Sequence, residues 1–178
     1  TSFLFQGQPV HTVYGGPIIW PLDQAEQLMR WYRDFIRSAP EELSGWFGFH
    51  RVPEGSPLPK ELHGHDGCVT TWCYTAPPEQ AEEVFRPIRE QGTPALDLAG
   101  PVPYPALQSM FDEMFYPPGL HWYWKGDFVR ELADEAIDIH LRYASSLPSE
   151  LCTMHLYPID GAVNRVGEGD TAFAFRDM

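Results

Sequence analysis

The chain has 178 residues, of which 43% are hydrophobic and 21% are charged, and these values are typical of one globular domain that can bury a core. Its formal net charge is −13, from 12 Lys and Arg against 25 Asp and Glu, which argues against nucleic acid and against anionic membranes as partners. No apolar run approaches the roughly 18 residues of a membrane span, and no signal peptide opens the chain.

The cysteines indicate the compartment. Cys68, Cys73 and Cys152 make an odd count without dense spacing, which favours a reducing environment, and we therefore expect a cytoplasmic protein. Cys68 and Cys73 are five positions apart in a predicted strand, so their side chains are expected on opposite faces of a sheet.

The first half of the chain predicts strands that alternate with helices. Alternation and β-rich composition predict strands at residues 10–19, 43–52 and 68–74. An apolar stripe at three- and four-residue steps predicts a helix that opens at Pro21 and ends before Pro40. A second helix is expected from residues 77 to 91, and residues 53–67 read as a loop.

The second half continues this pattern. Residues 91–102 read as an irregular crossing, and helices are expected at residues 104–115 and 128–147. Further strands are expected at residues 119–125, 151–157, 162–166 and 171–175. The sequence therefore predicts a single α+β domain over residues 1–178, with a broad antiparallel sheet, helices covering one face and ferredoxin-like repeats.

Several segments carry a family pattern in a fixed order. They are residues 13–21 (VYGGPIIWP), 85–89 (FRPIR), 103–108 (PYPALQ), 123–125 (YWK), 157–166 (YPIDGAVNRV) and 170–177 (DTAFAFRD). Together they resemble the substrate domain of FAD-linked oxidases of the berberine bridge enzyme type. In that family a strand of the form G-G-A-V-x-R-V leads into a strand that ends near A-F-x-x-R. Asp160 departs from this pattern, because the family usually has a glycine there.

The resemblance implies a function for a longer parent protein. Such a protein transfers a hydride from an alcohol- or amine-type donor to FAD, which is bound by a separate N-terminal domain. We therefore expect this chain to be a piece of that parent, with its own FAD-binding domain and a small-molecule substrate as partners. Residues 15–17 (GGP) lack the dinucleotide and Walker patterns, so the chain itself is expected to bind no FAD and to be inactive alone.

Candidate site residues follow from the same resemblance. Arg165 takes the position where plant members often carry an acidic base; it stays protonated and would instead stabilise an anion or clamp a carboxylate. Asn164 belongs to the same strand and is a candidate substrate-binding residue, as are Tyr123 and Lys125, which would share one face of a strand. Tyr104 and Gln108, four residues apart on a helix, match the family's Y-x-x-x-Q pattern and would bind substrate or pack the helix.

Two other interpretations stay open. The chain could be a stand-alone ferredoxin-like binding or oligomerisation module without redox activity, and a homodimer is compatible with either interpretation. A weaker hypothesis is a small metal-dependent hydrolase that uses His63, His65 and Asp66, although no second ligand pair stands at a recognisable interval. The carboxylates Asp134 and Asp138 share one helix face and read as a solvated surface.

Overall fold

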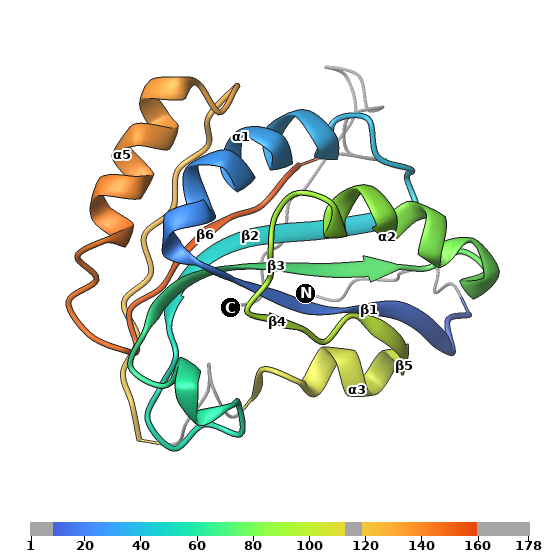
Figure 1. The fold of residues 1–178 in the computed structure, drawn as a ribbon, viewed down its shortest axis with the longest axis horizontal. Coiled ribbons are helices and arrows are strands. Elements are labelled where there is room, and N and C mark those ends of the chain that lie inside the picture. The colour runs from blue at the N-terminus through green and yellow to red at the C-terminus, as the bar shows by residue number, and fades with distance from the viewer. Residues whose placement is uncertain (1–8, 113–118, 160–178) are drawn as a thin grey trace, which may run out of the picture.

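Six strands form one antiparallel sheet in the computed structural model, which describes residues 9–112 and 119–159 (Figure 1). The order is β4-β1-β3-β2-β6, and β5 pairs with β1 beside β4. The three long strands are β1 (Thr12–Pro21), β2 (Leu43–Arg51) and β3 (Asp66–Tyr74). The short ones are β4 (Leu96–Asp97), β5 (Gly100–Pro103) and β6 (Met154–Leu156).

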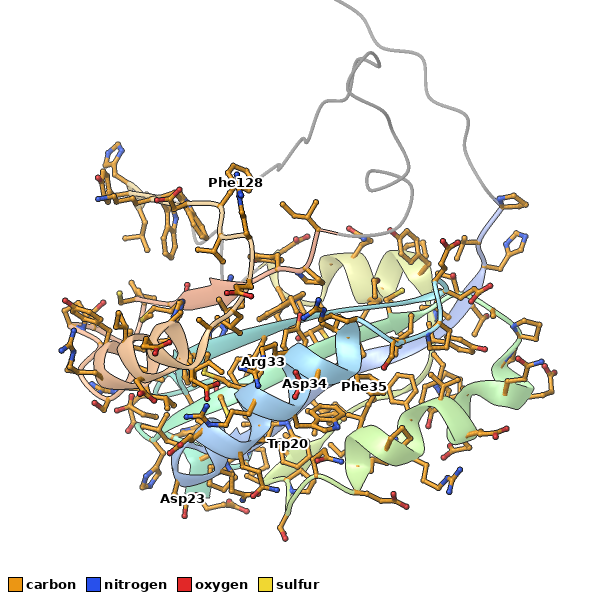
Figure 2. The ribbon with its side chains drawn as sticks, turned by 90° about the horizontal axis from the view of Figure 1, so that it is seen from above. Trp20, Asp23, Arg33, Asp34, Phe35 and Phe128 are labelled. Carbon is orange, nitrogen blue, oxygen red and sulfur yellow. The ribbon has the colours of Figure 1, made fainter. Side chains whose placement is uncertain are left out.

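Helices pack on the sheet and along its edges. They are α1 (Ala25–Ile36), α2 (Ala81–Arg89), α3 (Tyr104–Ser109) and α5 (Asp134–Ala144). Three short 3-10 turns are η1 (Leu22–Gln24), η2 (Lys60–Leu62) and η3 (Pro78–Gln80). Helices α1 and α2 cover one face of the sheet, whereas α3 lies on the opposite side, as Figures 1 and 2 show together. The α+β fold with an antiparallel sheet is thus confirmed.

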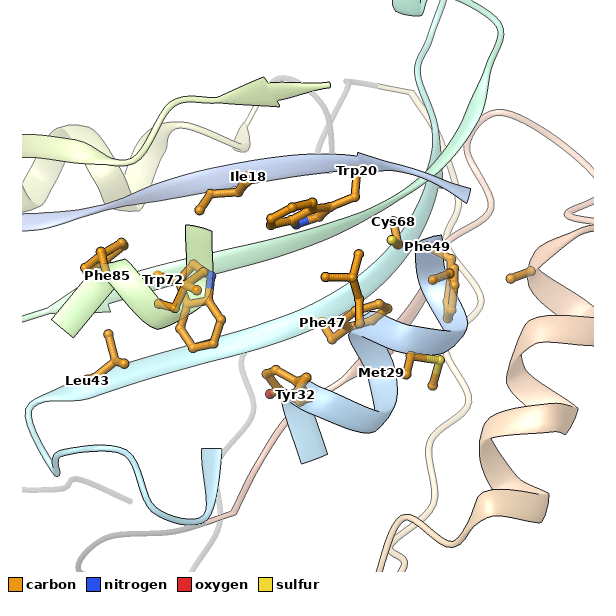
Figure 3. Packing of buried hydrophobic residues seen from close by; sticks show 14 of the residues in the cluster. Ile18, Trp20, Met29, Tyr32, Leu43, Phe47, Phe49, Cys68, Trp72 and Phe85 are labelled. Atoms are coloured by element: carbon orange, nitrogen blue, oxygen red, sulfur yellow. The ribbon is translucent and has the colours of Figure 1, made fainter. Parts of the chain in front are cut away.

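The main core lies between the sheet and helices α1 and α2 (Figure 3). Trp72 is fully buried at its centre, and its ring packs edge-on against Phe35 with centroids 5.8 Å apart. Gly45 on the neighbouring strand allows this packing, because a Cβ at that position would lie 2.2 Å from the Trp72 ring. Tyr32 joins α1 to β2 by donating a 2.9 Å hydrogen bond to the Gly45 carbonyl.

The first half of the chain agrees with the sequence predictions. The three long strands and the helices α1 and α2 lie where alternation and periodicity place them. Cys68 and Cys73 do lie on opposite faces: Cys68 is buried in the core, where burial raises the pKa of its thiol to about 12, and Cys73 is only partly buried. One strand–helix–strand–strand–helix–strand unit is therefore present. A second ferredoxin-like repeat is not confirmed.

The second half differs from the predictions in several places, and the helix expected at residues 104–115 ends at Ser109. The predicted strand at residues 119–125 is wrong, because residues 119–133 form neither strand nor helix. The helix predicted at residues 128–147 begins only at Asp134, which places the carboxylates of Asp134 and Glu135 in its first turn, where the helix dipole favours them. Phe128 lies outside the helix and is 78% exposed (Figure 2).

Strands β4 and β5 were not expected, since residues 91–102 read as an irregular crossing. The prolines of β5, at positions 101 and 103, are tolerated because this strand lies at the edge of the sheet. The strands predicted at residues 162–166 and 171–175 lie outside the described residues. No helix in the described part of the chain is both long and apolar enough to cross a membrane.

Candidate functional site

The sheet has a second face, which points away from α1 and α2. Its positions alternate with the core positions and follow from the strand register, because residues directly opposite each other share a face. On the described strands β1, β3, β2 and β6 they are Val13, Gly15, Pro17, Ile19, Pro21, Gly67, Val69, Thr71, Cys73, Ser44, Trp46, Gly48, His50 and His155. None of these carries a carboxylate, an ammonium or a guanidinium group, in a chain with 37 such residues (12 plus 25).

Three side chains form a hydrogen-bonded row at the β2–β6 end of the second face. Nε2 of His155 lies 3.0 Å from Nε2 of His50. Nδ1 of the same imidazole lies 2.7 Å from the hydroxyl of Tyr157, which follows β6. Both nitrogens of His155 are thus engaged, one on each side of the ring, and the row joins two strands that are more than 100 residues apart in sequence.

Aromatic rings line this row. The Trp46 ring lies 4.7 Å from the His155 ring and 6.0 Å from the Tyr157 ring. Phe111, two residues beyond the end of α3, packs edge-on against Trp46 at 5.9 Å. The row therefore lies against a cluster of aromatic rings.

Gly48 makes the close approach of these rings possible. A Cβ at position 48 would lie 2.7 Å from the His155 ring, 2.8 Å from the Trp46 ring and 2.9 Å from Nε2 of His50. Real Cβ atoms do not approach other atoms this closely, so a larger residue would push the rings apart. The glycine on β2 therefore sets the geometry of the row.

The environment of His50 favours its neutral form. Burial lowers the pKa of His50 well below its usual value, and the neighbouring His155 lowers it further. A small recess borders His50 and is also lined by Trp122 and Glu150. Its volume of about 10 Å³ has room for about one water molecule.

A buried hydroxyl adds to the polar groups of this face. Thr71 lies opposite Trp46 in the β2–β3 register and is 7% exposed. Among the described residues its Oγ1 is one of two buried side-chain polar atoms without a hydrogen-bond partner, the other being Nε1 of Trp72 in the main core. Buried hydroxyls normally have partners, so the Thr71 hydroxyl is an exception among the described residues.

The residues predicted from the sequence are brought together only in part. Tyr104 and Gln108 do share a face of α3, where the Gln108 amide donates a 2.7 Å hydrogen bond to the Tyr104 hydroxyl. Tyr123 and Lys125 lie in the irregular segment 119–133, and Tyr123 is 88% exposed. Asn164 and Arg165 lie outside the described residues.

Sequence reasoning missed His50, His155 and Tyr157. A usable signal was present: His50 follows Trp46 by four positions, and Tyr157 follows His155 by two, so each pair shares a strand face. What the sequence did not contain was the pairing of β2 with β6, which brings the two pairs together.

His63 and Asp66 contact other groups of the chain. Nε2 of His63 lies 2.9 Å from the Leu58 carbonyl, and Asp66 accepts two hydrogen bonds from the Arg51 guanidinium at 2.8 and 2.9 Å. Within residues 9–112 and 119–159, no three potential ligands converge as a metal site would require. The geometry therefore gives no support to the hydrolase hypothesis for His63, His65 and Asp66.

Comparisons with known proteins do not identify a function for the chain, so the residues of the second face are the basis for proposing one. No protein-family model matches the chain, and no curated protein matches it significantly. The second face offers an aromatic cluster beside the row of His50, His155 and Tyr157.

Proposed function

We propose that the chain is the substrate domain of a flavin-dependent oxidoreductase, whose FAD is bound by another domain of the parent protein. The observation that carries the proposal is the row Tyr157–His155–His50 on the uncharged face of the sheet. The order of sequence segments that resemble the berberine bridge enzyme type points the same way. The alternative activity, a metal-dependent hydrolase, has no comparable cluster in the described residues.

The chain's own residues would bind and orient the substrate. When bound, the flavin would accept a hydride from the donor's C–H bond, which is the chemistry that the cofactor supplies. Trp46 and Phe111 would exclude water from one side of the reacting groups. Tyr104 and Gln108 would border the substrate, since α3 leads directly to Phe111.

Arg165 and Asn164 remain part of the proposal through the resemblance alone. Arg165 would stabilise negative charge that develops during the reaction, and Asn164 would bind substrate. Lys125 and Tyr123 would reach the substrate only if the segment 119–133 packs against the parent's FAD-binding domain. We place the protein in the cytoplasm, where Cys68, Cys73 and Cys152 would stay reduced.

A second candidate function has one specific observation in its favour. Tyr123, Phe128 and Val129 are 88%, 78% and 67% exposed in the segment 119–133. Exposed apolar side chains of this kind mark association surfaces, and a binding or oligomerisation module, such as a homodimer, would use them. A hydrogen-bonded Tyr–His–His row has no role in that function, so we prefer the oxidoreductase.

The deciding experiment is the absorbance spectrum of the full-length parent protein, before and after denaturation. We expect flavin bands in the parent and none in the 178-residue chain alone. Flavin that stays with the denatured protein would be covalently attached. A colourless parent, or a yellow 178-residue chain, would contradict the proposal, and light scattering of the chain at rising concentration would then test the association module.

A further inference from the structure

We propose that a cleft at one end of the sheet, between the turns η1 and η2, binds a small organic cation: an ammonium group carried by an apolar body such as an aromatic ring. The cleft lies where β1 ends and β3 begins. The proposal adds a binding site that the proposed function does not use, and it does not depend on FAD in the parent protein.

Backbone hydrogen bonds hold the walls of the cleft. Strands β1 and β3 are antiparallel, so the end of β1, which leads into η1, lies beside the start of β3. Just beyond β2, the Val52 N–H donates a 3.0 Å hydrogen bond to the His65 carbonyl and ties the loop that carries η2 to the sheet. On the other side of β1, the Ala95 N–H donates a 2.8 Å hydrogen bond to the Ile19 carbonyl. The walls are therefore in place before a ligand binds.

The cleft has the size of a small-molecule site and a largely apolar lining. Its volume is about 270 Å³. Ligand pockets usually enclose roughly 300–1,000 Å³, so the cleft suits a ligand at the small end of that range. Four different segments contribute apolar side chains to it: Ile19 from β1, Leu22 from η1, Val52 after β2 and Leu62 from η2. The apolar body of a ligand would lie against these side chains.

The charged groups around the cleft are acidic. The titratable lining residues are Asp23, Glu61, His65 and Asp66, and the described residues that line the cleft include no Lys or Arg. Asp66 is already paired, because it accepts two hydrogen bonds from the Arg51 guanidinium. Asp23 in η1 and Glu61 in η2 are exposed, and their carboxylates have no hydrogen bond or ion pair within the described part of the chain. Two uncompensated negative charges therefore border an apolar cleft.

This combination determines the charge of the ligand. An anion would meet two like charges, and a neutral molecule of the same shape would gain the apolar contacts without offsetting them. A bare metal ion has no site here, since no three potential ligands converge among the described residues. An ammonium group offsets the carboxylates of Asp23 and Glu61 while its apolar body covers the walls. The formal net charge of −13 attracts cations to the chain from a longer range.

The first test is a titration of the 178-residue chain with phenethylamine, followed by two-dimensional nitrogen-15 NMR. We expect saturable shifts at backbone amides around the cleft, including those of Leu62, Gly67 and Ala95. Three further probes separate the contributions: phenethyl alcohol lacks the charge, hydrocinnamate reverses it, and methylamine lacks the apolar body. Each of the three should bind at least about fivefold more weakly than phenethylamine.

The second test uses the variants Asp23→Asn and Glu61→Gln, which remove one carboxylate each and keep its shape. Each should weaken phenethylamine binding about two- to fivefold and the double variant about tenfold, on the scale of exposed ion pairs, with smaller effects in high salt. Because both side chains are exposed, the variants should fold like the wild type. Glu83→Gln, at an exposed position of α2, removes the same charge outside the cleft and should leave the affinity unchanged.

The outcomes that would overturn the proposal are equally specific. They are the absence of saturable phenethylamine binding, equal affinity for phenethylamine and phenethyl alcohol, shifts that map away from the cleft, or unchanged affinity in the double variant. None of these measurements involves flavin, so a colourless parent protein would overturn the proposed function and leave the cation site standing.

Discussion

Arg33 on α1 and Asp134 at the start of α5 are joined by an ion pair of 2.6 Å that spans 101 positions of sequence. The same guanidinium donates a 3.2 Å hydrogen bond to the Leu132 carbonyl. Arg30, one turn earlier on α1, also pairs with Asp134. The hydrogen bond from Arg33, followed by the charge of Arg30, lowers the pKa of Asp134. These contacts place α5 beside α1.

Asp134→Asn should therefore reduce stability, because it removes the shared partner of two arginines. The pair is exposed, so the loss should be small and should diminish in high salt. Since the pKa of Asp134 is lowered in the folded protein, its contribution is present above the ordinary Asp pKa of about 3.9 and is lost as pH falls through the folded value. Thermal melts at neutral pH and at about pH 3 would check this. Glu135→Gln, in the same turn, is the matched control; equal melts for both variants would contradict the prediction.

Gly48→Ala should disrupt the row of His50 and His155. Its Cβ would come within 3.0 Å of three rings that cannot move without separating. We expect a loss of about 1–3 kcal/mol in the free energy of unfolding, the usual range for overpacking, and a changed His155 tautomer by NMR. Gly100→Ala is the control, because a Cβ there meets nothing within 4 Å. Two variants of equal stability would show that the rings are loosely packed.

Phe47→Ala should destabilise the main core strongly. Phe47 is fully buried, and its ring lies 5.3 Å from Phe49 and 5.7 Å from Tyr32 (Figure 3). Removing a buried phenylalanine side chain typically costs about 3–5 kcal/mol, which urea unfolding would measure. Phe128→Ala, at a position that is 78% exposed, should change the free energy of unfolding by no more than about 0.5 kcal/mol. A large loss in the second variant would instead place Phe128 in an apolar contact.

The fold could be predicted where the spacing of apolar residues in the sequence matches the side chains that the structure buries. The stripe of α1, with Leu28, Met29 and Tyr32, is buried as a unit, and the alternation of β1 and β3 matches the sheet. Prediction failed where contacts between distant parts of the chain determine where a helix begins or whether a strand forms. Phe128 has the right spacing for the α5 stripe, but the helix begins at Asp134, where Arg30 and Arg33 of α1 bind its first turn. Strands β4 and β5 form only because the edge of β1 is available.

The candidate site was harder to predict than the fold. Tyr104 and Gln108 meet as their four-residue spacing predicts, because a helix fixes that geometry locally. Tyr123 and Lys125 depended on a strand that does not form. The row of His50, His155 and Tyr157 needs the register of β2 with β6, and no local pattern encodes which distant strand pairs with which.

His50 should make the stability of the folded chain depend on pH. Its pKa is lowered in the folded protein by burial, and in the unfolded chain it returns to about 6.5. Between these two values the unfolded chain binds a proton at this position that the folded chain does not, so stability falls as pH decreases below about 6.5. His50→Gln removes this difference, and the free energy of unfolding of the variant should decline less than that of the wild type between about pH 7 and pH 5. Urea unfolding at several pH values would measure both slopes. Ser44→Ala, on the same face of β2 but without a titratable group, should keep the wild-type slope. Parallel curves for wild type and His50→Gln would mean that His50 takes up a proton equally well in the folded and the unfolded chain, against the lowered pKa.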